Sequence, residues 1–230
     1  MWEQYYSTKG CMRGRIGRFR QALQPKLPRG SIVLDFGCGS GDLSSSIGAA
    51  GYQVVGIDQA PNMILRATER LASERVTFQL LKESCGKAPL PFGDAVFDAV
   101  ICSSVLEYMD CLEFWLREFG RICRPGGWLF ATVPNMLHPK RSIEKIEIIV
   151  RSMLAGSDQH AGRLEYLTLS KNRFPLRRWL HLLGGAQWHA VRIEGRMKDL
   201  LLIAARHCEE RAVWEDTDPS SSAQPLKVAR

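Results

Sequence analysis

The chain has 230 residues, of which 45% are hydrophobic and 24% are charged. These proportions exclude a chain that is disordered throughout, and because no run of about 18 apolar residues occurs, we expect no transmembrane helix. The 31 Lys and Arg against 24 Asp and Glu give a formal net charge of +7, which favours phosphate-bearing or acidic partners.

The N-terminus and the cysteines favour the cytoplasm. Residues Met1–Gly10 have neither the apolar core nor the cleavage site of a secretory signal. None of the seven cysteines forms a C-x-x-C pair, so we expect reduced, mostly buried thiols rather than a zinc ribbon or a redox pair.

The first predicted element is an amphipathic helix over Gly10–Leu27, ended by Pro25 and Pro28. Its apolar stripe is Met12, Ile16, Phe19 and Leu23. Its outer face is basic and carries Arg13, Arg15, Arg18 and Arg20.

Strands and helices then alternate as far as residue 133. We expect strands at Ser31–Phe36, Gln53–Ile57, Val76–Leu81, Ala95–Cys102 and Trp128–Val133, helices at Leu43–Ala50, Ala60–Ala72 and Leu112–Cys123, and a turn at Arg124–Gly127. Such alternation predicts βαβ units, and therefore an α/β fold with a mostly parallel sheet and helices on both faces. After Pro134 we expect helices at Ile143–Leu154 and Asn172–Leu183, and two closing strands at Trp188–Glu194 and Leu200–Ala205.

No second core or internal repeat is present, so residues 1–208 are expected to form one domain. The polar tail Glu209–Arg230 is typical of a disordered segment.

A glycine cluster, Gly37-Cys38-Gly39-Ser40-Gly41, directly follows the first buried strand. Glycines there allow a tight turn and let a ligand lie against the main chain. Asp58 ends the second strand about twenty residues later, where an acidic residue reaches ribose hydroxyls in nucleotide sites. A dinucleotide site would need a small residue where Asp42 stands, and its carboxylate would repel a pyrophosphate. A ligand without phosphate is therefore favoured.

The successive segments V-L-D-F-G-C-G-S-G, V-V-G-I-D-Q-A-P-N-M-I, L-P-F-G-D-A-V-F-D-A-V, S-S-V-L-E-Y-M and R-P-G-G-W-L-F-A-T-V-P-N resemble the motifs of class I S-adenosylmethionine-dependent methyltransferases. The small-molecule branch that includes ubiquinone and menaquinone biosynthesis enzymes is the most similar. The resemblance covers Ser31 to Asn135. It implies a Rossmann-like seven-stranded sheet with one antiparallel strand near the C-terminus, and S-adenosyl-L-methionine as the cofactor, which leaves as S-adenosyl-L-homocysteine.

The resemblance also implies cofactor contacts. Asp35, Gly37, Gly39 and Gly41 would line the methionine part, Asp58 would accept from both ribose hydroxyls, Gln59 and Met63 would flank the adenine, and Ser103 would lie beside the cofactor. An N-terminal lid within residues 1–28 would bring Trp2, Tyr5 and Tyr6 over the site, unless these aromatic residues only anchor the first helix.

Two residues depart from the family pattern. The family's acidic residue for the adenine amino group is replaced by Gly86, so Glu83, Ser84, Cys85 or a backbone carbonyl takes its place. Phe36 is bulkier than the usual small aliphatic residue.

Methyl transfer to a hydroxyl or an amine is helped by a base. Glu107 and Tyr108 follow the fourth strand and His138 follows the fifth, at the sheet edge where ligands bind, so these are the candidates for catalysis. His160 and His181 are weaker candidates, because a histidine is more often a surface or satisfied core residue. Metal-binding relatives have E-x-L-E-H where this chain has Ser104-Val105-Leu106-Glu107-Tyr108. The single carboxylate predicts a metal-independent reaction.

The acceptor side is expected to be an insertion at residues 136–170. Basic residues gather there and beyond it, at Arg163, Lys171, Arg173, Arg177 and Arg178, either as a solvated face or to meet an acidic, phosphorylated or carrier-protein-bound small molecule.

The main expectation is methyl transfer to O or N, less readily C, of a small molecule. An RNA or protein methyltransferase, or a non-catalytic cofactor-binding partner subunit, remains an alternative. Nucleic acid is not the expected partner, because no aromatic-interleaved basic motif occurs. The sequence predicts no oligomeric state.

Overall fold

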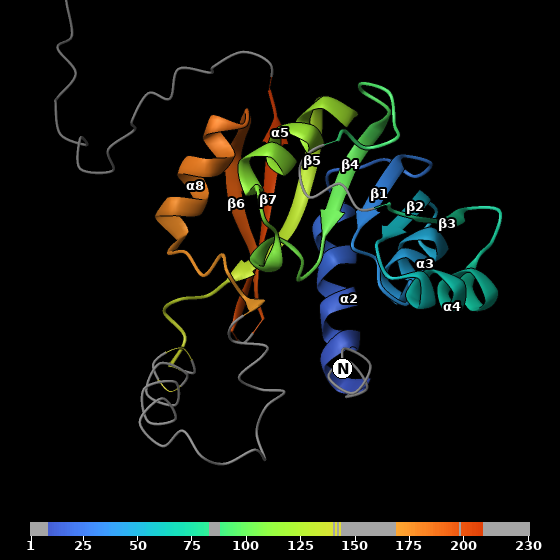
Figure 1. Cartoon of the computed structure of the whole chain (residues 1–230), viewed down its shortest axis with the longest axis horizontal. Coiled ribbons are helices and arrows are strands. Elements are labelled where there is room, and N and C mark those ends of the chain that lie inside the picture. Colours follow the sequence, from blue (N-terminus) through green and yellow to red (C-terminus); the bar gives the residue numbers. More distant parts are fainter. Residues whose placement is uncertain are drawn as a thin grey trace, which may run out of the picture.

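The computed structural model describes residues 9–82, 88–139, 141, 143, 169–197 and 199–208. The described strands form one seven-stranded sheet in the order β3-β2-β1-β4-β5-β7-β6 (Figure 1). They are β1 (Ile32–Phe36), β2 (Gln53–Asp58), β3 (Val76–Leu80), β4 (Phe97–Cys102), β5 (Cys123–Pro134), β6 (Trp188–Met197) and β7 (Leu200–His207).

The first five strands are parallel, and β7 runs antiparallel to both of its neighbours. The predicted fold class, a Rossmann-like sheet with one antiparallel strand near the C-terminus, is thus confirmed. The described helices are α2 (Lys9–Leu23), α3 (Asp42–Ala49), α4 (Pro61–Leu71), α5 (Leu112–Ile122) and α8 (Leu176–Gly185), with a short 3₁₀-helix η1 (Leu106–Tyr108).

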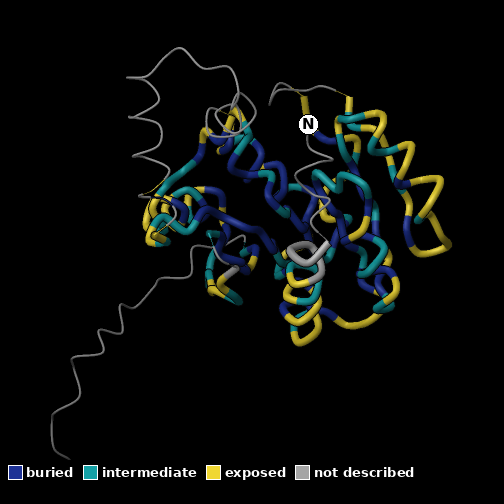
Figure 2. The backbone as a smooth tube through the Cα atoms, turned by 90° about the horizontal axis from the view of Figure 1, so that it is seen from below, coloured by how far each residue is buried: buried dark blue, intermediate teal, exposed yellow. Residues whose placement is uncertain are grey.

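Helices cover the sheet on both faces because its central strands are apolar on both faces. Successive residues of a strand point to opposite sides. In β1, Val33 faces the core formed with α2 and α3, whereas Leu34 and Phe36 face the core formed with α5 and α8. Figure 2 shows the buried positions running through the middle of the molecule, with exposed positions on its outer turns. A continuous apolar run is therefore the expected sequence of such a strand.

One element differs from its prediction. The turn expected at Arg124–Gly127 lies inside β5, which begins at Cys123. Phe97 pairs with Cys123 and Ala99 with Trp128, so two steps along β4 match five steps along β5, and the extra residues form a bulge. Gly127 is required there, because a Cβ atom would lie 2.5 Å from the Cys123 sulfur and 2.8 Å from the Asp98 carbonyl oxygen.

Several helix boundaries also differ from the predicted ones. The first helix ends at Leu23, two residues before Pro25, rather than at Leu27. The helix predicted from Asn172 begins at Leu176, directly after Pro175, because the residue before a proline is disfavoured in a helix. The Asn172 side chain donates hydrogen bonds to the carbonyls of Leu106 and Met109. The predicted helix at Ile143–Leu154 lies, apart from Ile143, outside the described residues, as do the N-terminal lid residues 1–8 and the tail from residue 209.

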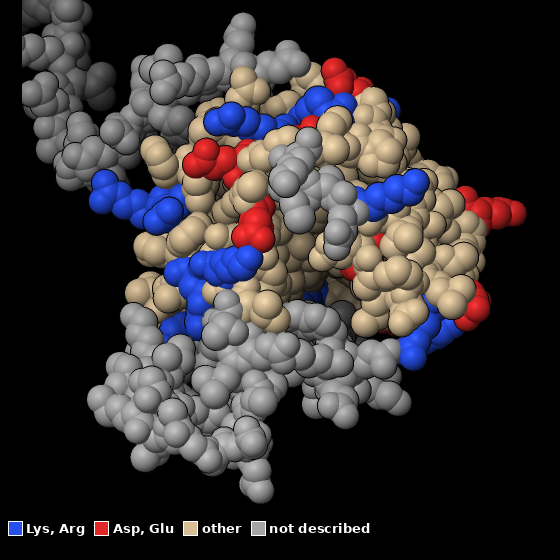
Figure 3. Space-filling model, in the orientation of Figure 1, with Lys and Arg blue, Asp and Glu red and all other residues tan. Residues whose placement is uncertain are grey.

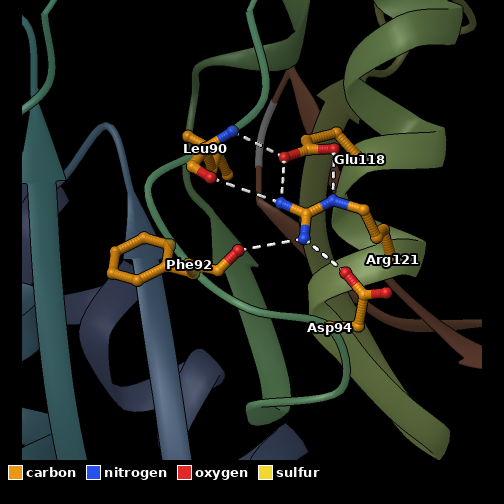
Figure 4. A network of polar contacts seen from close by, with 5 residues as sticks. All are labelled: Leu90, Phe92, Asp94, Glu118 and Arg121. Carbon is orange, nitrogen blue, oxygen red and sulfur yellow. Dashed lines mark hydrogen bonds and ion pairs between the residues drawn. The ribbon is translucent and has the colours of Figure 1, made fainter.

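The segment before β4 is held by one arginine. Arg121 of α5 donates to the carbonyls of Leu90 and Phe92, to Asp94 at 2.6 Å, and to Glu118 at 2.6 and 2.9 Å (Figure 4). Glu118 in turn accepts the Leu90 N–H at 2.6 Å. The L-P-F-G-D segment is thereby fixed against α5.

The five cysteines whose side chains are described are free thiols; Cys102 and Cys123 are buried, Cys38 and Cys208 are half-buried, and Cys111 is exposed. The expectation of mostly buried thiols is therefore met only in part. Among the described helices, none has the length and apolar character needed to cross a membrane.

Candidate functional site

The glycine cluster turns the chain from β1 into α3 at the carboxyl edge of the sheet. Gly37, Gly39 and Gly41 have φ values of +73°, +53° and +80°, in the left-handed region that favours glycine. A Cβ atom at Gly37 would lie 2.3 Å from Val105, and one at Gly41 would lie 2.6 Å from Phe78, whereas a Cβ atom at Gly39 would meet no described atom within 4 Å. Gly37 and Gly41 therefore serve packing, and Gly39 borders open space.

Asp35 lies at the end of β1 beneath this loop and is 1% exposed. Ser44 donates to its Oδ2 at 2.6 Å, while its Oδ1 has no hydrogen-bond partner among the described residues. Burial raises the pKa of Asp35 to about 6, the Ser44 hydrogen bond opposes the rise, and the nearby charge of Asp58 adds to it. A buried oxygen without a partner is costly, so this atom suits a donor from a bound ligand.

Asp58, at the end of β2, faces the same loop. Its Oδ2 accepts the N–H of Gly39 and its Oδ1 accepts the N–H of Ala60, both at 2.9 Å. These bonds fix the carboxylate, and each oxygen keeps a second lone pair that can accept from a hydroxyl. The next residue, Gln59, is exposed, and Met63 is half-buried in the first turn of α4. The acidic residue, the adenine-side candidates and the glycine loop thus share one edge.

The segment after β4 adds a cation to this edge that the sequence reasoning missed. Ser103 is half-buried, and Ser104, with φ of +57°, donates its N–H to Thr132 Oγ1 at 2.7 Å. The Ser104 hydroxyl accepts a 2.8 Å hydrogen bond from Arg15 Nη1. Arg15 was expected on the solvated face of the first helix. It lies four and eight residues before the fully buried Phe19 and Leu23, so its place in the buried stripe was the signal available.

Glu107 lies in η1 and is 2% exposed. Ser170 donates to its Oε2 at 3.2 Å, and the N–H of Asn172 donates to its carbonyl at 2.9 Å. Burial raises the pKa of Glu107, and the charge of Arg141 and hydrogen bonds from Ser170 and Tyr108 oppose the rise. Two segments distant in sequence, with Arg141 in one and Ser170 in the other, therefore converge on this carboxylate.

Arg141, itself 2% exposed, extends the cluster around Glu107 to the turn between β6 and β7. Its Nη2 donates to the carbonyl of Asp199 at 2.8 Å and lies 3.6 Å from Asp199 Oδ2. The buried charges are thus compensated by one another, as a buried ion pair requires. Tyr108 contacts Glu107 and is half-buried, and His138 is half-buried and accepts the N–H of Arg141 on its carbonyl. His181 is exposed on α8.

Three of the predicted site residues, Tyr6, Ser84 and His160, lie outside the described residues, and so do Trp2, Tyr5 and residues 83–87.

The unusual Phe36 is explained by packing. Its ring lies 5.2 Å from that of Trp115 and 4.9 Å from that of Phe119, so it faces α5 rather than the glycine loop. Within the described part of the chain, no group of three or more His, Cys, Asp or Glu is arranged to hold a metal ion.

Residues 34–131 match the methyltransferase domain family. A ubiquinone biosynthesis O-methyltransferase from Leptothrix cholodnii is 29% identical over 57% of this chain and 57% of that protein. A demethylmenaquinone methyltransferase from Tropheryma whipplei is 31% identical over 50% of this chain and 45% of that protein. The chain therefore spans about half the length of the curated relatives that it matches.

Solved structures agree on the fold. An S-adenosylmethionine-dependent methyltransferase from Methanosarcina mazei matches with a TM-score of 0.58 over 82% of this chain and 98% of that one, at 19% identity. The matched family covers the glycine loop, Asp58 and the segment after β4, which are the residues that the geometry brings together. Over residues 34–131 the chain is therefore similar to S-adenosylmethionine-dependent methyltransferases.

Proposed function

We propose that this chain transfers a methyl group from S-adenosylmethionine to an oxygen or nitrogen atom of a small-molecule acceptor. The observation that carries the proposal is the pair of carboxylates around the glycine loop: Asp58 held by two backbone N–H groups, and Asp35 with one buried oxygen lacking a described partner. Both face a loop with open space at Gly39. Two anionic acceptors at a Cβ-free loop fit a cationic nucleoside better than a phosphorylated one.

The described residues fit the cofactor group by group. The ribose hydroxyls are donors for the free lone pairs of Asp58, and the ammonium of the methionine part is a donor for Asp35 Oδ1. Its carboxylate needs a cation, and Arg15 has no described carboxylate partner while its Nη1 is held by Ser104. Gln59, Met63 and Ser103 complete the proposed cofactor residues, with Ser84 and Tyr6 from outside the described part.

The bound cofactor supplies an activated methyl group, so the chain's task is to hold the acceptor in line and to accept its proton. Glu107, Tyr108 and His138 are the proposed residues for this step. Because Glu107 is buried and hydrogen-bonded to the Tyr108 side chain, we propose that it acts through Tyr108. The acceptor proton would pass to the Tyr108 oxygen as the Tyr108 proton passes to Glu107.

Two observations support a small-molecule acceptor. The matched relatives are named for quinone biosynthesis. The basic side chains on the face seen in Figure 3 form separate groups with acidic residues among them, rather than one continuous track for a nucleic-acid backbone. In this proposal residues 1–28 and 136–170 shape the acceptor side of a single domain over residues 1–208.

The test is an acceptor screen that measures release of S-adenosylhomocysteine by the whole chain. The panel holds catechols and quinols, primary amines, carrier-protein-bound acids and unfractionated tRNA. We expect turnover with a small molecule, lowered at least tenfold in Tyr108→Phe and in Glu107→Gln but not in the exposed control His181→Gln. Turnover confined to tRNA would contradict the proposal, as would equal rates in Tyr108→Phe and the wild type.

A further inference from the structure

The amino edge of the sheet, opposite the glycine loop, carries a depression of about 510 Å³ lined by three arginines. Arg29 precedes β1, Arg70 lies in the last turn of α4, and Arg75 precedes β3. Because β1, β2 and β3 are parallel neighbours, the segments that enter them meet at one edge. This arginine pocket takes no part in the function proposed above.

The backbone around the arginine pocket is held by hydrogen bonds between its segments. The N–H of Gly30 donates to the carbonyl of Gly51 at 2.8 Å, and the N–H of Val54 donates to the carbonyl of Arg75 at 2.7 Å. The stem of Arg29 lies over Gly51, where a Cβ atom would be 3.5 Å from its Cγ and Cδ. The arginines are therefore brought together by the fold itself.

The residues that line the pocket do not balance its positive charge. None of its lining residues is acidic, and none of the three guanidinium groups pairs with a carboxylate in the part of the chain that the structure describes. Helices α3 and α4 end here, and each contributes about half a negative charge. Roughly one negative charge against three positive ones leaves a net attraction for anions.

We propose that the arginine pocket binds a small phosphate-bearing anion. Guanidinium groups meet phosphate oxygens with two parallel N–H donors each, and three of them can surround one or two phosphate groups. Ser45 and Ser73 also line the pocket and add hydroxyl donors. Ser73 Oγ accepts the N–H of Arg75, so its own proton remains available. The site lies at the opposite edge from the cofactor residues and is independent of them.

The experiment is isothermal titration of the whole chain with inorganic phosphate and with pyrophosphate. We expect saturable binding with one site, weakened at least tenfold in the double variant Arg70→Gln/Arg75→Gln. The charge-matched control Arg20→Gln/Arg192→Gln removes two exposed arginines from α2 and β6 and should bind within twofold of the wild type. Circular dichroism melting of each variant checks that the fold is retained.

Three results would overturn the inference. Wild-type chain that binds neither anion has no such site. Equal weakening in both double variants would assign binding to the net charge rather than to the pocket. Tighter binding of a nine-nucleotide uridine RNA than of pyrophosphate, with a steep loss of affinity on adding salt, would assign the surface to a nucleic-acid backbone instead. Because S-adenosylmethionine binding is measured on the same variants, failure here is distinguishable from failure of the proposed function.

Discussion

Asp35 combines a buried carboxyl, one oxygen without a described partner and a pKa raised to about 6 by burial. A carboxyl whose pKa is raised on folding stabilises the fold below its unfolded pKa of 3.8, and this contribution is lost as the pH rises through 6. The difference amounts to about 3 kcal/mol. Ionised Asp35 is thus disfavoured in the free chain, and a bound cation would stabilise it.

We therefore expect the affinity for S-adenosylmethionine to fall about tenfold between pH 7.5 and pH 5, because Asp35 loses its charge over this range. Asp35→Asn should bind weakly at both values. It should also raise the unfolding free energy of the free chain at pH 7.5. Titration calorimetry and chemical denaturation at the two pH values measure these effects, with the exposed Asp42→Asn as control. A wild-type affinity independent of pH would contradict the assigned role.

Arg15 provides a second residue-scale prediction. Arg15→Gln keeps a donor for Ser104 but removes the charge that would meet the cofactor carboxylate, so its dissociation constant for S-adenosylmethionine should rise about tenfold or more. Arg18→Gln is the matched control, since Arg18 lies on the same helix but approaches Gly195 of β6. Equal affinities in Arg15→Gln and Arg18→Gln would remove Arg15 from the site.

At the scale of single elements, substitutions in the glycine loop should affect stability at one position and ligand binding at another. Ala at Gly37 adds a 2.3 Å contact with Val105 to the strain of a positive φ, and should destabilise the chain more than Ala at Gly39, which adds only the strain, about 1 kcal/mol. Gly39→Ala should nevertheless weaken S-adenosylmethionine binding at least tenfold, because its methyl group enters the open space. Gly30→Ala, at φ +87° with nothing within 4 Å, is the control at the opposite edge. Thermal melts and calorimetry compare them, and undiminished binding in Gly39→Ala would argue against a ligand there.

Elements with strong local signals were predicted well. The apolar strands and the glycine turn follow from local patterns, and the carboxyl-edge site follows from their alternation. The β5 bulge was not predictable, because Arg-Pro-Gly-Gly is a turn sequence and only pairing with β4 carries it into a strand. The start of α8 after Pro175 was open to prediction, because the residue before a proline is disfavoured in a helix, whereas the long-range hydrogen bonds of Asn172 were not.

For the whole molecule, the parallel sheet and the antiparallel β7 could be predicted, and so could the position of Asp35, Asp58 and Ser103 at the carboxyl ends of neighbouring strands. The sequence could not show that Glu107 is buried, because its partners Ser170 and Arg141 come from distant segments. The sequence also could not show which arginines lie at which edge of the sheet. In the sequence, the arginines of the first helix cannot be told apart from those before β1 and β3. In the structure, Arg15 lies at the glycine-loop edge of the sheet, and Arg29 and Arg75 lie at the opposite edge.

The most direct measurement is isothermal titration of the whole chain with S-adenosylmethionine, comparing wild type with Asp58→Asn. We expect one site in the wild type and a loss of roughly 10- to 100-fold in Asp58→Asn, since a charged acceptor of the ribose hydroxyls is removed. Glu69→Gln, an exposed carboxylate of α4, should match the wild type. Absence of binding in the wild type, or equal affinity in Asp58→Asn, would contradict the cofactor site at the glycine loop.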